Sequence, residues 1–115
     1  MISKVILVIL AITAVFVLYR RFTAVRISGS EARSLVAEGA MLVDVRSPGE
    51  FSGGHIEGAI SIPIQELAGR TDELGDKGVP IVLYCQSGAR SAMAKRLLES
   101  RGFTNVHNMG GMGSW

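Results

Sequence analysis

Hydrophobic positions change their spacing from one segment of the chain to the next, and this predicts strands that alternate with helices. Residues 81–84 are apolar without polar alternation, which is typical of a strand buried on both faces, and a further buried strand is predicted at residues 41–45. Along residues 93–98 apolar side chains recur four positions apart, which predicts one side of a helix. We therefore expect an α/β domain in which a parallel sheet carries helices on both faces.

Capping and turn residues place the shorter elements around this sheet. Further strands are predicted at residues 24–27, at residues 59–62 and around Val106. Ser28 and Glu31 have the spacing of a capping box, which predicts the start of a helix. The order of elements is thus strand and helix in alternation.

Prolines and glycines set the remaining boundaries. Pro48 predicts the first turn of a helix, and Pro63 predicts the start of another helix that Gly75 closes. The glycine-rich segment 110–113 predicts a flexible closing loop. No internal repeat or low-complexity tract interrupts the pattern.

The first residues of the chain have a different composition from the rest. Residues 5–19 are apolar except for Thr13, and the 48% hydrophobic content of the chain is on the high side for a soluble domain because its excess is concentrated there. We predict a transmembrane anchor at residues 2–21 and one domain at residues 22–115. A cleavable signal peptide is the alternative, since Lys4 precedes an apolar core, but no small-x-small cleavage site follows closely.

The charge balance supports this division of the chain. The formal net charge is +2, and Lys4, Arg20 and Arg21 in the N-terminal segment account for the excess. A nearly neutral domain offers no electrostatic footprint for nucleic acid. The basic residues that follow the apolar run predict a single-pass membrane protein, in contact with the lipid bilayer through residues 2–21, whose domain is cytoplasmic.

Cys85 follows the second buried run and precedes the predicted helix. Amides of a first helical turn favour an anion, so a cysteine at this position is biased towards its reactive thiolate. Gly88 suits the tight turn that must follow. The alternative is that a lone cysteine is simply a small buried hydrophobic residue. The single cysteine excludes an internal disulfide and a cysteine-based zinc site, and we expect no metal.

Residues 85–91, Cys-Gln-Ser-Gly-Ala-Arg-Ser, resemble the active loop of the single-domain rhodaneses, which are sulfurtransferases. Gln86 departs from the many members that carry Arg there, and it removes a positive charge from the loop. The resemblance covers about residues 24–115. Its other motifs are Asp44-Val45-Arg46 with Glu50-Phe51, Gly54-His55-Ile56-x-Gly58-Ala59, Ile62-Pro63, and Gly110-Gly111-Met112 with Trp115.

The resemblance implies a rhodanese-like three-layer fold and a sulfurtransferase that uses no cofactor. Cys85 would take a sulfane sulfur from a donor such as thiosulfate as a persulfide, and pass it to cyanide, a small thiol or a protein thiol. Arg46 is expected either to bind a substrate anion or to pair with Glu50, and Asp44 to support neighbouring loops. The residues expected to cradle the substrate are Gln86, Ser87, Gly88, Ala89 and Arg90.

Two other functions remain open at this point. Cysteine-based phosphatases use a similar loop, but they carry one more residue between the cysteine and the arginine than Cys85 and Arg90 enclose. A shorter ring fits one sulfur atom better than a phosphoryl group. The second alternative is a membrane-tethered sulfur-carrier or binding module without turnover of small donors.

Overall fold

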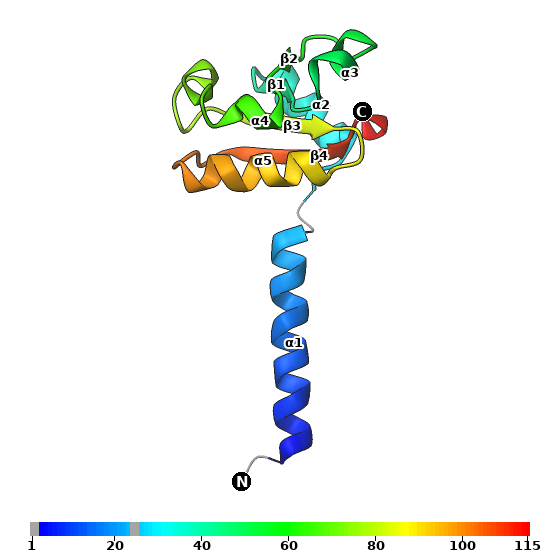
Figure 1. The fold of residues 1–115 in the computed structure, drawn as a ribbon, viewed down its shortest axis with the longest axis vertical. Coiled ribbons are helices and arrows are strands. Elements are labelled where there is room, and N and C mark those ends of the chain that lie inside the picture. Colours follow the sequence, from blue (N-terminus) through cyan, green and yellow to red (C-terminus); the bar gives the residue numbers. More distant parts are fainter. Residues whose placement is uncertain (1–2, 24–25) are drawn as a thin grey trace.

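A computed structural model describes residues 3–23 and 26–115 of the chain, with the backbone alone for residues 20–23. In this part of the chain four parallel strands form one sheet in the order β2-β1-β3-β4 (Figure 1). Every residue of the inner strand β3 is buried, as expected for a parallel strand covered on both faces. The strands are β1 Met41–Asp44, β2 Ile60–Ser61, β3 Ile81–Cys85 and β4 Val106–Gly111.

Helix α5, Ala89–Ser100, packs on one face of the sheet. Its Ala94 and Leu98 are buried in one cluster with Leu83 of β3. Met93, which the spacing also placed on this side, is exposed instead. The reason is geometric, because neighbouring residues on a helix are turned about 100° from each other.

The other face of the sheet is covered by α2, Gly29–Ala37. Ala32 is fully buried in one cluster with Tyr84 of β3, and Leu35 and Val36 pack partly buried against it. Because successive residues of β3 point to opposite faces, the two clusters lie on opposite sides of one sheet. The predicted α/β arrangement, a parallel sheet with helices on both faces, is confirmed.

Serine side chains cap two of the helices. The Ser28 hydroxyl oxygen accepts the Glu31 N–H at 3.1 Å, as predicted for the start of α2. A complete capping box opens α3, Pro48–Ser52: the Ser47 hydroxyl accepts the Glu50 N–H, and the Glu50 carboxylate accepts the Ser47 N–H. Both caps satisfy amides that a helix cannot pair internally.

The helix predicted from Pro63 to Gly75 is in fact two short pieces, α4 Ile64–Leu67 and the 3-10 helix η1 Thr71–Leu74. Gly69 lies between them, and glycine lowers helix propensity more than any residue except proline. The predicted end at Gly75 is correct, since its φ of 75° is one that glycine adopts readily.

The predicted closing loop is more regular than its glycine content indicated. Gly110 and Gly111 extend β4 and pair with Tyr84 and Cys85, and a short 3-10 helix, η2 Met112–Ser114, follows. This pairing continues the sheet as far as the end of β3. It therefore fixes the strand end from which the candidate site begins.

The strand predicted at residues 24–27 lies partly outside the described residues. Within them, Arg26 forms an isolated parallel bridge with Asn108, and the Ile27 N–H donates to the Asn108 carbonyl at 2.9 Å. Arg26 is thereby held beside the edge strand β4.

The membrane location predicted for the N-terminal segment is wrong. Residues 5–19 lie within helix α1, Lys4–Thr23, which Figure 1 shows projecting away from the sheet. Among the described residues, however, no helix is both long and apolar enough to cross a bilayer. The apolar part of α1 rises only about 22 Å against a hydrocarbon core of roughly 30 Å. The single-pass location, the bilayer contact through residues 2–21 and the orientation based on them are corrected accordingly.

Candidate active site

Cys85 is the last residue of β3, and a short loop connects it to α5. The Gly88 N–H donates to Cys85 Sγ over 2.9 Å, and the Ser91 hydroxyl lies 3.5 Å from the same sulfur. The Ser91 hydroxyl also donates to the Gly88 carbonyl at 3.1 Å. The loop thus curls around the thiol and holds it from two sides.

The surroundings of Cys85 act on its pKa in opposite directions. Burial raises the pKa of the thiol, since a charged thiolate is disfavoured away from water. Hydrogen bonds from the Ser91 side chain and from the backbone amides of Ser91, Gly88 and Ser87 lower the pKa, and together they outweigh burial. The net shift is downward, which increases the fraction of nucleophilic thiolate.

Gly88 is needed both for its backbone conformation and for its lack of a side chain. Its φ is 105°, a value that other residues rarely adopt. A Cβ at this position would also lie 2.2 Å from Nη2 of Arg26. The Arg26 guanidinium therefore rests directly against the loop, and its Nη2 donates to the Ser87 carbonyl at 3.4 Å.

Arg46 forms a buried ion pair with Asp44, at the end of β1. Its Nη2 lies 2.7 Å from Asp44 Oδ2, and the two side chains are 4% and 0% exposed. The Asp44 carboxylate also accepts the backbone N–H of Arg46. Arg46 donates further to the Gly54 carbonyl and to Oε1 of Gln86. Its hydrogen bonds with Asp44 raise the pKa of Arg46, so the guanidinium stays charged.

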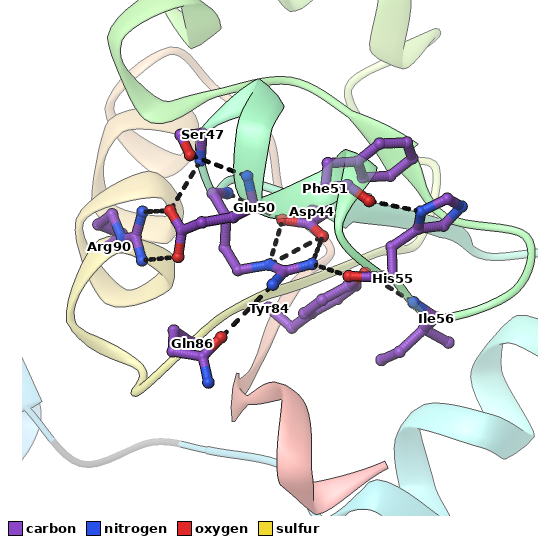
Figure 2. A network of polar contacts seen from close by, with 11 residues as sticks. Asp44, Ser47, Glu50, Phe51, His55, Ile56, Tyr84, Gln86 and Arg90 are labelled. Atoms are coloured by element: carbon purple, nitrogen blue, oxygen red, sulfur yellow. Dashed lines mark hydrogen bonds and ion pairs between the residues drawn. The ribbon is translucent and has the colours of Figure 1, made fainter.

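A second ion pair joins α3 to the start of α5. Arg90 contacts the two carboxylate oxygens of Glu50 at 2.6 and 3.0 Å (Figure 2). Glu50 therefore pairs with Arg90, and Arg46 pairs with Asp44. Hydrogen bonds from Arg90 and Ser47 lower the pKa of Glu50 to about 2. Arg46 and Arg90, two of the arginines beside the loop, are thus already matched by carboxylates.

The other loop residues differ in exposure. Gln86, Ser87 and Ala89 are exposed, whereas Gly88 is buried. Among the residues that the structure describes, Ser91 places its hydroxyl group beside Cys85 Sγ. The sequence interpretation missed Ser91, although a small polar residue at a buried position in the first turn of an otherwise apolar helix face was a signal.

Tyr84 ties the loop between α3 and β2 to the sheet. Its hydroxyl oxygen accepts the Ile56 N–H at 3.1 Å, and burial raises the pKa of Tyr84 to about 12. His55 is stacked on Phe51 with the ring centroids 3.7 Å apart, and its Nδ1 lies 2.9 Å from the Phe51 carbonyl oxygen. These contacts brace the segment beside the loop (Figure 2). In residues 3–23 and 26–115, no group of His, Cys, Asp or Glu side chains has the arrangement to hold a metal ion.

Comparisons with known proteins match residues 28–115 to the rhodanese-like domain. A Bacillus subtilis protein, "Uncharacterized protein YqhL", is 46% identical over 66% of this chain and 60% of its own length. "Thiosulfate sulfurtransferase PspE" of Escherichia coli is 38% identical over 61% of this chain and 68% of its own. The solved structure of a human single-domain sulfurtransferase, TSTD1, has a TM-score of 0.68 at 34% identity and covers 80% of this chain and 92% of its own.

Proposed function

Because the chain belongs to the rhodanese-like sulfurtransferase family, we propose that its domain, residues 22–115, transfers a sulfane sulfur through a persulfide on Cys85. One observation carries this proposal. Cys85 Sγ lies at the end of a buried strand and accepts the Gly88 N–H at 2.9 Å, with its pKa shifted downward. A thiol in this setting is a nucleophile near neutral pH.

In the first step the Cys85 thiolate attacks the outer sulfur of thiosulfate. A bond forms between Sγ and that sulfur, the sulfur–sulfur bond of thiosulfate breaks, and its electron pair leaves with sulfite. The product on the protein is a persulfide that carries one negative charge. Backbone amides of residues 86–90 are the groups available to hold this charge.

In the second step a nucleophilic acceptor attacks the outer sulfur of the persulfide. Cyanide leaves as thiocyanate, or a thiolate leaves as a persulfide of its own, and the Cys85 thiolate returns with the electron pair of the broken bond. No electrons are gained or lost over the cycle, so the reaction needs no cofactor.

The ion pairs support a positioning role for Arg46 and Arg90 in place of direct contact with the donor. Each guanidinium is already neutralised by a carboxylate, Asp44 or Glu50. Gln86 adds no charge to the loop. We therefore assign recognition of the small donor to the loop amides and to Cys85 itself.

The length of the loop argues against a cysteine-based phosphatase. Cys85 and Arg90 enclose four residues, one fewer than in those enzymes. The shorter ring fits one sulfur atom better than a phosphoryl group.

Mass spectrometry of the full chain tests the proposal. Thiosulfate should add the mass of one sulfur atom to the protein, and cyanide should remove it and yield thiocyanate. Cys85→Ser should abolish the mass gain, since a hydroxyl is far less ionised than a thiol near neutral pH.

Two other outcomes would change the assignment. A persulfide that forms but is never discharged to small acceptors would indicate a sulfur carrier. Absence of the mass gain with every sulfur donor, together with Cys85-dependent hydrolysis of an aryl phosphate, would overturn the sulfurtransferase proposal.

A further inference from the structure

The peptide group that joins Ser87 to Gly88 makes a contact on each of its two sides. Its N–H donates to Cys85 Sγ over 2.9 Å. Its carbonyl oxygen accepts a hydrogen bond from Nη2 of Arg26 at 3.4 Å. The group is planar and trans, so its carbonyl and its N–H point in opposite directions. The guanidinium and the sulfur therefore lie at opposite edges of one rigid unit.

The backbone by itself does not select this orientation of the peptide group. A half-turn rotation of the group would mainly change ψ of Ser87 and φ of Gly88, and it would reverse the sign of the Gly88 φ, which is 105°. Glycine adopts φ values of either sign about equally readily. After such a rotation the carbonyl oxygen would face the Cys85 thiolate, and the two negative groups would repel each other. A contact that binds the carbonyl on its outer side therefore favours the observed orientation.

Arg26 is held in position by close contact with two glycines from different segments. A Cβ on Gly88 would lie 2.2 Å from Nη2 of Arg26, and a Cβ on Gly110 of β4 would lie 2.9 Å from its Nη1. The backbone of Arg26 is tied to the same strand by its bridge to Asn108. The side chain thus passes from Asn108 over Gly110 to Gly88, and neither glycine has a side chain that would displace it.

Two features distinguish Arg26 from the other polar groups around the loop. The Ser91 hydroxyl donates to the carbonyl of Gly88, which belongs to the next peptide group. Arg46 and Arg90 are matched by carboxylates, whereas no ion pair involves Arg26 in the part of the chain that the structure describes. An unmatched guanidinium gives a charge-assisted hydrogen bond, which is stronger than a neutral one.

We propose that Arg26 is a positioning residue for sulfur transfer: it holds the Ser87 carbonyl outward and thereby keeps the Gly88 N–H on the sulfur of Cys85. The proposal rests on the function proposed above and adds to it a residue from outside the loop. Arg26 does not touch the donor. Its effect reaches the sulfur through one peptide group, which stabilises the thiolate that attacks the donor and that returns when the sulfur is passed on.

Titration of the thiol in Arg26→Met tests this role. Methionine keeps a long flexible side chain but has no donor, and Arg26 is exposed, so the fold should be kept. The ultraviolet absorbance of the thiolate measures Cys85 alone, because the chain has one cysteine. At a fixed pH near neutral the ratio of thiolate to thiol should fall about fivefold, the effect of about one hydrogen bond. The value of kcat/KM for thiosulfate should fall with it, and this loss should shrink at high pH, where both proteins carry the thiolate.

Arg96→Met is the matched control. It removes the same charge from a residue that lines the same groove as Arg26. Arg96 is exposed, and within residues 3–23 and 26–115 no hydrogen bond joins it to the loop. The ratio of thiolate to thiol should therefore equal that of the parent. Salt should leave the difference between Arg26→Met and the parent largely intact, because screening weakens long-range charge effects more than a direct contact.

The charged groups on the other sides of the loop stay in place in these experiments. Arg90, whose charge interacts with the Cys85 thiol, keeps its partner Glu50. The buried pair of Arg46 and Asp44 is kept as well. A change in the titration therefore comes from the substituted side chain.

Nuclear magnetic resonance follows the peptide group directly. In Arg26→Met the amide signal of Gly88 should move and its hydrogen exchange should become faster, because the N–H is no longer held on the sulfur. The amide signals of β3 up to Tyr84 should stay in place, which shows that the variant is folded.

An unchanged thiolate ratio in Arg26→Met, or an equal fall in Arg96→Met, would overturn the role of Arg26. So would a Gly88 amide signal that the substitution does not move. These measurements use the thiol and the peptide group themselves, so they do not depend on sulfur transfer. If the thiolate ratio falls as expected but the parent forms no persulfide with any sulfur donor, the proposed function fails and the positioning of the thiolate by Arg26 stands.

Discussion

Two arginine–carboxylate pairs stand beside the Cys85 loop, and they differ in solvent exposure far more than in length. Arg46 and Asp44 approach to 2.7 Å with side chains 4% and 0% exposed. Arg90 and Glu50 approach to 2.6 Å with side chains 33% and 34% exposed. The first pair is buried at the carboxyl end of β1, and the second is about one third exposed at the start of α5.

The difference determines what each pair can do. Two buried charges are no longer hydrated, so removing either partner leaves the other charge buried and unpaired, which strongly destabilises the fold. Two half-exposed charges are screened and hydrated, so their separation has a small effect on stability. The Arg46–Asp44 pair therefore acts as a fixed part of the fold, whereas the Arg90–Glu50 pair is free to adjust the charge near the thiol.

The most direct way to break this contrast is Asp44→Asn, which leaves the Arg46 charge buried without a counter-ion. We expect a loss of about 3 kcal/mol in the free energy of unfolding, measured by urea denaturation. Glu73→Gln is the matched control, because it breaks the Arg70–Glu73 pair, which is as short as 2.6 Å but lies on the surface. It should leave the unfolding free energy almost unchanged.

If both substitutions were equally mild, burial would not distinguish the two kinds of pair. The double variant Asp44→Leu with Arg46→Met provides a second check. It removes both charges at once, and it should regain most of the stability that Asp44→Asn loses.

Ser91→Ala separates the direct contact with the sulfur from the effect of the ion pairs. The variant loses the hydroxyl that lies 3.5 Å from Cys85 Sγ and that donates to the Gly88 carbonyl. We expect a loss of about 1 kcal/mol in unfolding free energy. The pKa of the Cys85 thiol should rise, since the Ser91 side chain lowers it in the parent.

The pH dependence of alkylation by iodoacetamide measures this pKa. Ser100→Ala is the control, because Ser100 also donates to a backbone carbonyl of α5 but lies far along the helix. An unchanged alkylation profile in Ser91→Ala would assign the low pKa to the backbone amides alone.

The sequence was sufficient to predict the elements that hold the site, because they depend on local patterns. The buried run at 81–84, the glycine at 88 and the apolar spacing at 93–98 predicted a strand, a turn and a helix in the observed order. The capping residue Ser28 was also found from its spacing to Glu31. Each of these signals is a pattern among residues that are close neighbours in the sequence.

The partners of the charged side chains could not be predicted in the same way. Glu50 and Arg90 are 40 positions apart, and they meet because β1 and β3 end at the same edge of the sheet. From the sequence, Arg46 was expected to bind a substrate anion or to pair with Glu50. In the structure it pairs with Asp44, two positions away. Local spacing gives several candidate partners, and only the three-dimensional arrangement selects one.

The thiol reactivity of two variants of the exposed pair should change in opposite directions. Arg90→Gln removes a positive charge that interacts with Cys85, so the pKa of the thiol should rise. Glu50→Gln instead leaves the Arg90 charge unmatched, so that pKa should fall. We expect about a twofold slower and a twofold faster alkylation at neutral pH, respectively, because exposed pairs have small coupling energies.

The smallest expected effect is the contribution of Glu50 to stability in acid. Arg90 and Ser47 lower the pKa of Glu50 from 4.5 to about 2 in the folded protein. A carboxyl group with a lowered folded pKa stabilises the protein above its unfolded pKa, and this contribution is lost as the pH falls through the folded value. The difference in thermal midpoint between the parent and Glu50→Gln should therefore shrink between about pH 4.5 and pH 2.

Arg90→Gln is the control for this acid dependence. Without Arg90 the pKa of Glu50 should move back towards its ordinary value, because the hydrogen bond from Arg90 is the largest cause of the shift. The remaining contribution of Glu50 should then disappear at higher pH than in the parent. The same acid profile with and without Arg90 would show that the capping contacts of Ser47, rather than the exposed ion pair, hold the Glu50 carboxylate in its charged form.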